Sequence, residues 1–498
     1  MSKLNRKLIF HILGLLLMFN GFAMLISAFV SYLTNDGVLN EMTIVSSLVI
    51  FCGWLLMTIS KKNERKINKR DAYFVVVLGW LVMVFSGMLP YVVTESISSF
   101  PNIFFETMSG YTTTGSTVIN DIDALPKSII FWRSMTHWLG GMGIIVLAIA
   151  ILPLLGIGGM QLFSAEAPGL TGDKIHPRIS DTAKRLWLIY VGLTLLETIL
   201  LTFAGMSFFD AINNSMSNIA SGGFSSKNDS IGFWNDNPLI QYIIIFFMFL
   251  AGTNFVLIYF GLTGKFKKIL QDTEFKWYVS FISTFVIIAT LFLFFNVNLS
   301  STEVYHPEIF GKLESSFRHS LFQVVALVTT TGFVTGDFIS WTPFLTMMFF
   351  AIMFMGGSSG STSGGVKVLR HLILIKNGLL EFKRSLHPNA IFPLRHNNHV
   401  VEKPIIIHVL AFFVLYLILF IIGAGVLSIL GLDFVSAIGG AASSLGNVGP
   451  ALGSLGPVNN YAELSIAAKI FCSFLMLIGR LELFTVLILF TPFFWKKN

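Results

Sequence analysis

The sequence predicts an all-α integral membrane protein, with four tandem repeats of span, short helix and span in pseudo-four-fold symmetry and a pair of spans before them. Three observations predict this class. Only 12% of the 498 residues are charged, whereas soluble domains average about 25%. About ten apolar segments are long enough to cross a bilayer. A turn rich in Thr, Ser and Gly recurs at four regularly spaced places in the chain.

The composition argues against several other classes of protein. Hydrophobic residues make up 54% of the chain, the mean hydropathy is +0.76, and no polar segment is long enough for a large soluble domain. The formal charge of +7 lies in short basic clusters between apolar segments, which argues against nucleic-acid binding. Cys52 and Cys472 each lie in an apolar stretch and indicate neither a disulfide framework nor a metal site. Without an HExxH motif or paired intramembrane carboxylates, the chain is not expected to be an enzyme.

The expected spans follow from the length of the apolar segments, since a spanning helix needs about 20 such residues. They are 8–33, 43–60, 73–94, 128–155, 185–207, 239–263, 277–299, 343–375, 404–430 and 464–494, and some are long enough to tilt or break. The basic start before the first span resembles a signal peptide, but no small-residue cleavage site follows it. We therefore expect a retained anchor.

The basic residues predict the orientation. Of the 33 Lys and Arg residues, 26 lie in the N-terminus, the C-terminal tail and the segments 61–70, 174–185, 265–276 and 367–403. With ten spans, all of these fall on one side, which the positive-inside rule makes cytoplasmic. Both termini are then cytoplasmic. The opposite face carries acidic residues that would attract cations.

The repeated turns lie in the segments 104–121, 209–229, 317–338 and 434–453, each after a short apolar amphipathic stretch. When they are aligned at Gly115, Gly223, Gly332 and Gly449, the spacings are 108, 109 and 117 residues, which marks an internal repeat. A short segment that enters the membrane from one side must be buried in protein or line a water-filled path. Four such segments around one axis predict a pore. The predicted units are 1–70, 71–175, 176–270, 271–400 and 401–498.

The chemistry of the turns suits a monovalent cation. An ion that leaves water needs oxygens in place of its hydration shell, and backbone carbonyls in glycine-containing turns supply them. The short helices would direct their partly negative C-terminal ends at the same axis. The four turns contain no carboxylate, so a dehydrated monovalent ion fits them better than a divalent one.

Seven stretches of the sequence carry a resemblance to a known family. They are TTTGSTVIND (112–121), HWLGGMGIIVLAIAILPLLGIGGMQLF (137–163), SGGFS (221–225), TTTGF (329–333), MGGSSGSTSGGVKVLR (355–370), GNVGPALG (446–453) and IGRLELFTVLILFTPFFW (478–495). At these positions the chain resembles the superfamily of Trk, Ktr and HKT potassium transporters. The extra pair of spans before the first repeat makes it similar to the Trk membrane subunit in particular.

The resemblance implies a selectivity filter at the four turns. The filter positions that it transfers to this chain are Thr113, Thr114, Gly115, Ser221, Gly222, Gly223, Thr330, Thr331, Gly332, Asn447, Val448 and Gly449. Their backbone carbonyls would bind K⁺ as the transported ion, with no organic cofactor in the chain. Gly222 and Val448 stand where two other copies have Thr, so we expect less strict discrimination between K⁺ and Na⁺.

The eighth expected span contains a glycine-rich interruption. Five glycines and several Ser and Thr residues lie between Phe354 and Leu369, and each Gly costs about 1 kcal/mol in a helix relative to Ala. A continuous helix is therefore not expected, and the broken backbone must line a cavity. A surface of small residues that packs against another helix is the alternative. The resemblance implies a gate that includes Gly356, Gly357, Ser358, Ser359, Gly360, Ser361, Gly364, Gly365, Lys367 and Arg480.

Several charged residues lie within or beside the expected spans. Arg480 lies inside the last span and would oppose cations on the permeation path; an ion pair with Glu482 or a contact with loop carbonyls is the alternative. His137 and Glu197 could relay protons, but satisfied structural groups are the expectation. Glu106 and Asp121 are expected to be solvated charges at the pore mouth. The basic segment 376–403 suits a partner or lipid headgroups.

The function that the resemblance implies is potassium uptake across the inner or plasma membrane of a bacterial cell. It implies a homodimer regulated by a cytosolic nucleotide-binding, TrkA-like ring. The chain has no nucleotide-binding motif of its own, so any nucleotide control must come from a partner. The alternative is the potassium-binding subunit of an ATP-driven pump. A carrier with inverted repeats is disfavoured, because these repeats run in parallel.

Overall fold

The computed structural model describes residues 4–60, 69–146, 179–299, 306–397 and 399–496. Helices dominate this part of the chain. The main helices outside the repeated turns are α1 (Arg6–Thr34), α2 (Leu39–Ile59), α3 (Lys69–Gly87), α6 (Lys127–Val146), α9 (Ile179–Phe203), α11 (Pro238–Ala251), α14 (Thr273–Asn296), α17 (Val368–Leu386), α18 (Lys403–Ile429) and α20 (Ile466–Arg480). Four helices of 12 to 17 residues, called the short helices below, precede the repeated turns: α5 (Phe100–Tyr111), α10 (Phe208–Ile219), α15 (Lys312–Val328) and α19 (Phe434–Gly446).

The remaining elements are short. They are α4 (Leu89–Val93), η2 (Ser230–Trp234), α12 (Phe255–Leu262), α13 (Phe266–Gln271), α16 (Pro343–Ile352), η4 (Gly453–Leu455), α21 (Phe484–Leu487), η5 (Ile488–Phe490) and α22 (Pro492–Trp495). The strands β1 (Arg395–His396) and β2 (His399–Val400) form a two-stranded antiparallel hairpin, in which Arg395 pairs with Val400. The all-α membrane fold predicted from the sequence is confirmed.

The spans are less regular than the apolar segments that predicted them. Six described helices are long and apolar enough to cross a membrane, and two further pairs, α11 with α12 and α20 with α21–η5, are each bent by 110°. Within 343–375, α16 ends at Ile352 and no helix follows until Val368, so the predicted interruption is confirmed. The end of the expected span 128–155 lies outside the described residues.

Local sequence explains where many helices begin. The Asp272 carboxylate accepts a hydrogen bond from the Phe275 amide at 2.7 Å and caps α14, and Asp433 caps α19 through the amides of Val435 and Ser436. Pro238 and Pro343 occupy the first turns of α11 and α16, where the missing N–H leaves no hydrogen bond unmade. These caps fix the ends of helices that lie close to the repeated turns.

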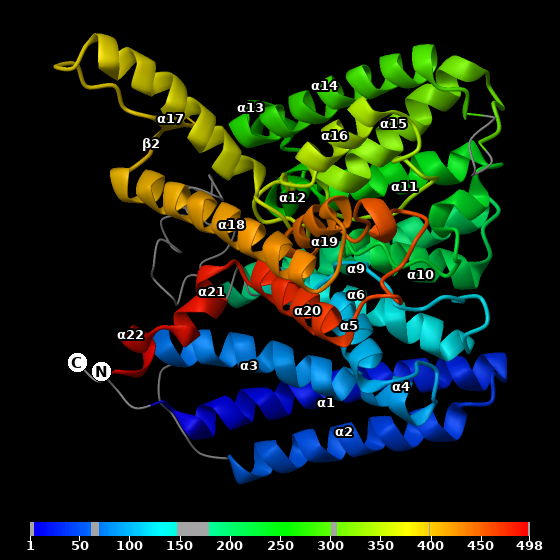
Figure 1. Ribbon diagram of the computed structural model, residues 1–498. Coiled ribbons are helices and arrows are strands. Elements are labelled where there is room, and N and C mark those ends of the chain that lie inside the picture. The colour runs from blue at the N-terminus through cyan, green and yellow to red at the C-terminus, as the bar shows by residue number, and fades with distance from the viewer. Residues whose placement is uncertain (1–3, 61–68, 147–178, 300–305, 398, 497–498) are drawn as a thin grey trace.

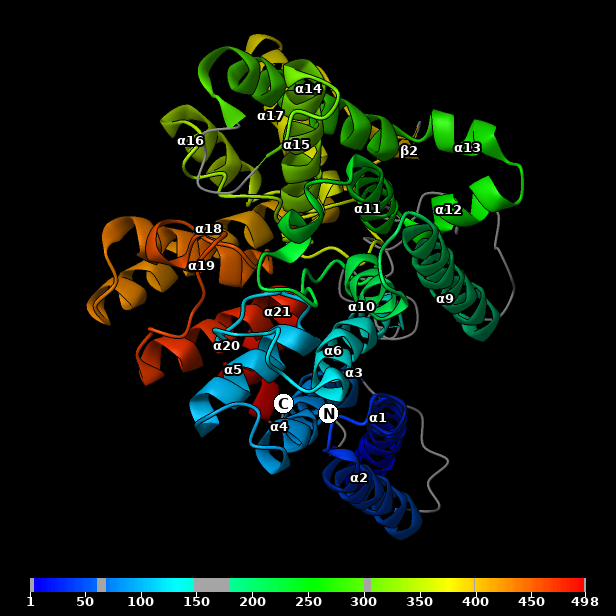
Figure 2. The same ribbon diagram turned by 90° about the vertical axis from the view of Figure 1, so that its right-hand side faces the viewer.

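The four short helices surround the centre of the molecule, in the order α5, α10, α15 and α19 (Figure 2). Helices α1 and α2 lie together at one edge. Both termini lie at the same end of the bundle as the tip of α17 and the β hairpin (Figure 1). This arrangement fits four parallel repeats preceded by two additional spans.

Polarity is distributed as expected for a protein that is solvated by lipid. Large apolar side chains are exposed on the outer helices, among them Phe29, Ile44 and Ile421. The short helices instead bury polar side chains, such as Ser109, Asn214, Ser320 and Ser444, each with no exposed surface. The polar groups therefore gather around the centre, where the four turns meet.

Candidate functional site

Each short central helix ends in the same backbone motif. The residues Thr113, Ser221, Thr330 and Asn447 have left-handed φ angles of 49°, 55°, 53° and 53°. The amide of the next residue then bonds back to the last helical turn, with N···O distances of 2.9 Å from Thr114, Gly222 and Thr331 and 3.0 Å from Val448. This is a Schellman-type end, which normally places glycine at the left-handed position. Four non-glycine residues share it, so the four turns repeat in geometry as well as in spacing.

The aligned glycines join the four turns into a ring. Gly115, Gly223, Gly332 and Gly449 all have positive φ angles, between 74° and 102°. A Cβ added to any of them would lie between 2.0 and 2.6 Å from a carbonyl oxygen of another repeat. The carbonyls belong, in that order, to Gly222, Thr331, Val448 and Thr114, each the residue before the next glycine. The fourth contact returns to the first repeat and closes the circle. Glycine is required here for the close backbone approach as well as for φ.

A cavity lies on one side of the ring. It has a volume of about 190 Å³ and is lined by the four ring glycines and by the loops that follow them. Lys227 lines this cavity and pairs with Asp123 at 2.8 Å. The hydrogen bond to Asp123 raises the pKa of Lys227, so this cation stays charged beside the ring. Asp121 is exposed, as expected for a charge at the mouth.

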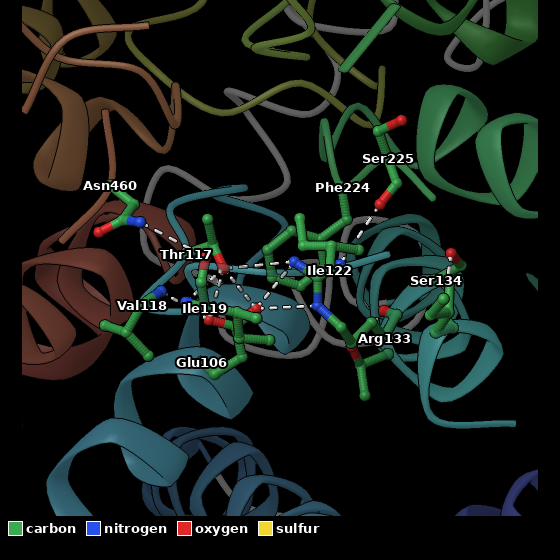
Figure 3. Close-up of polar contacts among 12 residues, drawn as sticks. Glu106, Thr117, Val118, Ile119, Ile122, Arg133, Ser134, Phe224, Ser225 and Asn460 are labelled. Atoms are coloured by element: carbon green, nitrogen blue, oxygen red, sulfur yellow. Dashed lines mark hydrogen bonds and ion pairs between the residues drawn. The ribbon is translucent and has the colours of Figure 1, made fainter. Parts of the chain in front are cut away.

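Glu106 is not a solvated mouth charge, and that expectation is wrong. It has no exposed surface and forms a buried ion pair with Arg133 at 2.9 Å (Figure 3). The same carboxylate accepts hydrogen bonds from the Thr117 hydroxyl at 3.0 Å and the Val118 amide at 2.9 Å. The Arg133 guanidinium lies 4.1 Å from the centre of the Phe224 ring. The ion pair therefore connects the first turn, which Glu106 contacts, to Phe224 in the second turn.

The third repeat has a comparable support. Arg318 pairs with Glu314 at 2.8 Å and also donates to the Gln241 side chain. The Gln241 amide donates to Asn235 at 2.6 Å, and Asn235 donates to the Thr335 carbonyl at 2.9 Å. A buried arginine thus holds the loop after the third turn, as Arg133 does for the first turn.

The interrupted segment 353–367 fills the break in another span. The bend between α11 and α12 leaves backbone groups without helical partners, which cannot face lipid. The Gly252 carbonyl accepts a hydrogen bond from the Ser358 amide at 2.8 Å, and the Phe255 amide donates to the Gly360 carbonyl at 3.3 Å. The Thr362 amide donates to the Ala251 carbonyl at 3.3 Å. Two irregular segments therefore satisfy each other inside the protein.

The same segment is bonded to the ends of the central helices. The Thr362 hydroxyl lies 2.9 Å from the Ser221 hydroxyl, and the Gly364 amide donates to the Thr330 hydroxyl at 2.6 Å. Ser221 and Thr330 are the left-handed residues at which two of the turns begin. The segment therefore lies on the side of the ring where the short helices end, which we call the helix end of the ring. The cavity lies instead beside the ring glycines and the loops that follow them.

Two buried cations, Lys367 at the end of this segment and Arg480 from α20, donate hydrogen bonds to its carbonyls. The Lys367 ammonium donates to the Ser363 carbonyl at 2.5 Å, and the Arg480 guanidinium donates to the Thr362 carbonyl at 2.9 Å. Arg480 does not pair with Glu482, which instead pairs with Arg370 at 2.7 Å. Arg480 thus makes the contact with a loop carbonyl that was one alternative to a role on the permeation path, and it does not make the ion pair with Glu482.

His137 and Glu197 lie beside the second repeat. The Nδ1 atom of His137 lies 2.8 Å from the Ser217 hydroxyl, and its ring stacks on Phe224 at 4.0 Å. The Asn218 amide donates to Glu197 at 2.6 Å. Both side chains are fully buried and make these bonds, but the Nε2 atom of His137 and the second carboxylate oxygen of Glu197 have no hydrogen-bond partner among the described residues. The expectation of satisfied structural groups is therefore met only in part.

Sequence reasoning missed two contributors to this site. Thr362 was not among the gate residues, although its hydroxyl and carbonyl contact both the ring and Arg480. The pair of Glu106 and Arg133 was also missed. The signal was available, since both are charges within apolar helical segments and one such charge normally needs an opposite partner.

Comparisons with known proteins agree over nearly the whole chain. Residues 39–497 match the TrkH family model, described as a cation transport protein. The Trk system potassium uptake protein TrkH of Salmonella typhimurium is 39% identical over 494 residues, covering 99% of each chain. The protein TrkG of Escherichia coli is 34% identical over 458 residues, 91% of each chain. The crystal structure of the potassium transporter TrkH from Vibrio parahaemolyticus matches with a TM-score of 0.88 at 35% identity, covering 99% of this chain and 100% of that one.

Proposed function

Since this chain belongs to the TrkH family of cation transport proteins, we propose that it conducts K⁺ into the cell through the ring of the four repeated turns. The observation that carries the proposal is the closed circle of contacts between each ring glycine and a carbonyl of another repeat. Backbone carbonyls brought together in this way replace the hydration shell of a cation. Relatives over the full length of the chain are named potassium uptake proteins, and the family is not an enzyme class.

The proposed filter is formed by the residues transferred to the four turns in the sequence. The residues Thr114, Gly222, Thr331 and Val448 supply the carbonyls that lie against the ring glycines. Nothing in the comparisons supports the alternative of a subunit in an ATP-driven pump.

The test is ion flux into liposomes that contain the purified chain alone. We expect K⁺ uptake that exceeds Na⁺ uptake and persists without a pH gradient. Liposomes that take up neither ion faster than protein-free vesicles would contradict the proposal. Comparison with and without a pH gradient also separates passive conduction from proton-coupled transport.

The segment 353–367 is proposed as the gate. Its contacts with Ser221 and Thr330 place hydrogen-bonded backbone at the helix end of the ring, where an ion leaving the ring must pass. Arg480 and Lys367 bind its carbonyls and hold it there. Deletion of residues 358–364 is therefore expected to raise K⁺ flux. Unchanged or lower flux in a well-folded deletion variant would contradict a gating role.

The membrane placement and the partners are also part of this proposal. The termini, the tip of α17 and the β hairpin lie at one end of the bundle (Figure 1), which we assign to the cytoplasmic face of the inner membrane. A homodimer and a cytosolic nucleotide-binding regulator are proposed, the latter at the basic segment 376–403. Light scattering of the purified chain and nucleotide-dependent flux with its cytosolic partner would test them.

A further inference from the structure

The fourth turn differs from the other three at its ring glycine. The Gly449 carbonyl accepts hydrogen bonds from three buried hydroxyls: Ser443 at 2.8 Å, Ser116 at 3.0 Å and Tyr461 at 3.1 Å. In the described part of the chain, no side chain donates to the carbonyls of the other three ring glycines. A carbonyl oxygen has two lone pairs, and three donors leave none free for an ion.

The residue after Gly449 makes this arrangement compatible with a cation path. When a filter peptide turns its carbonyl away, it normally turns an N–H group toward the ion, which repels a cation. Pro450 has no N–H, so this peptide presents no donor. The corresponding residues in the other repeats, Ser116, Phe224 and Phe333, all have one. The proline ring instead lies beside Gly332, where its Cδ would meet an added Cβ at 2.9 Å.

The three hydroxyls are themselves held firmly. Tyr461 is buried, its amide donates to the Thr117 carbonyl at 2.8 Å, and its ring packs on Phe105 at 5.2 Å. Ser443 lies in the last turn of α19, and Ser116 follows the first ring glycine. The hydroxyls come from both sides of the junction between the first and fourth repeats. The glycine–carbonyl contact at this junction is also the longest of the four in the ring. The distance from a Cβ added to Gly449 to the Thr114 carbonyl oxygen is 2.6 Å.

We infer that Tyr461, Ser443 and Ser116 withdraw the Gly449 carbonyl from the ion path, so that the glycine level of the filter is a three-sided cation site. Tyr461 and Ser443 are then positioning residues that set ion preference. The inference rests on the proposed function for its ion. In the account of filter selectivity that rests on the number of coordinating carbonyls, a higher number favours the larger K⁺ over Na⁺. Releasing the Gly449 carbonyl should therefore increase the preference for K⁺.

The test compares the purified full-length parent with Tyr461→Phe, Ser443→Ala and the double variant. Titration calorimetry with KCl and NaCl gives the ratio of the Na⁺ and K⁺ dissociation constants, and a thermal melt gives stability. The double variant should raise the ratio above the parental value, with smaller increases in each single variant. Tyr91→Phe is the matched control, because the buried Tyr91 hydroxyl has no hydrogen-bond partner among the described residues. The ratio for this variant should stay at the parental value.

Two results would overturn the inference. One is an unchanged ratio together with a lower melting temperature, which would make the hydroxyls structural only. The other is a decrease in the ratio, which would mean that the hydroxyls maintain K⁺ preference. If the double variant does not fold, the ratio for Ser443→Ala alone decides, since it removes a single oxygen. K⁺ uptake by the parent in liposomes tests the proposed function separately, because the binding ratio does not depend on transport.

Discussion

Replacing one ring glycine with alanine tests the backbone ring with a matched control in the same chain. Gly332 and Gly264 both have a φ angle of +74°. Alanine in this left-handed region costs about 1–2 kcal/mol at either position. The surroundings differ: a Cβ on Gly332 would lie 2.0 Å from the Val448 carbonyl oxygen, whereas a Cβ on Gly264 would have no atom within 4 Å.

The magnitude follows from this clash. Real Cβ atoms essentially never approach another atom within 3.0 Å, so in Gly332→Ala the Val448 carbonyl must move by about 1 Å, from 2.0 to 3.0 Å. A 1 Å displacement of a group that is positioned against a substrate costs about 100-fold in rate. We therefore expect K⁺ uptake by Gly332→Ala to fall roughly 100-fold. Gly264→Ala should retain parental uptake.

The assay is uptake of K⁺ into liposomes with equal amounts of each purified variant, alongside a thermal melt. Gly332→Ala should lose more stability than Gly264→Ala, because its clash with the Val448 carbonyl adds to a backbone strain that both variants share. The reasoning would be refuted if Gly332→Ala transported K⁺ at the parental rate, or if Gly264→Ala lost as much transport as Gly332→Ala.

Two further predictions concern residues around the ring, and a third concerns the hairpin of β1 and β2. Arg480→Ala removes a charge-assisted hydrogen bond to the Thr362 carbonyl, worth about 1.5–3 kcal/mol, so K⁺ flux should rise by about tenfold or more; parental kinetics would count against it. Glu106→Gln leaves Arg133 buried and unpaired, which should cost about 3–5 kcal/mol in a thermal melt, and an unshifted melt would disprove this. Burial lowers the pKa of His396 to about 4 from 6.5. Between pH 4 and pH 6.5 the imidazole binds more protons in the unfolded chain than in the folded one. The free energy of unfolding of the hairpin should therefore be about 2 kcal/mol lower at pH 5 than at neutral pH. Hydrogen exchange should detect this loss in the parent and not in His396→Gln.

The sequence was most informative where the backbone itself forms the site. The spacing of the four glycines, the short helices before them and the interruption in 343–375 were all predicted, because each depends on glycine or on the length of an apolar segment. These are local properties. The positive φ angle of Gly115 and the missing helix after Ile352 follow from them directly.

Tertiary contacts explain what the sequence did not reveal. The bend after α20 has no glycine or proline at its centre; Glu482 and Leu483 take positive φ angles there, and Glu482 pairs with Arg370 from a distant helix. The bend after α11 did carry a signal, since Gly252 ends one helix and Asn254 caps the next through the Val256 amide. Its partner segment could not be predicted, because the two are about 100 residues apart in the chain.

Glu106 illustrates the same limit for single charges. Its place just before the first turn suggested the pore mouth and therefore solvent. Burial followed instead from Arg133 and Thr117, which reach the carboxylate only once α5 and α6 have packed. A charge near a predicted opening thus needs its partner to be located before its role can be assigned.

The central claim is that four backbone turns form one binding site for a dehydrated monovalent cation. Anomalous diffraction from crystals grown with Rb⁺ in place of K⁺ tests it most directly. We predict a peak on the axis enclosed by Thr114, Gly222, Thr331 and Val448, and no such peak in crystals grown with Na⁺ alone. Rb⁺ peaks only at the protein's outer surface, with an empty ring, would contradict the account.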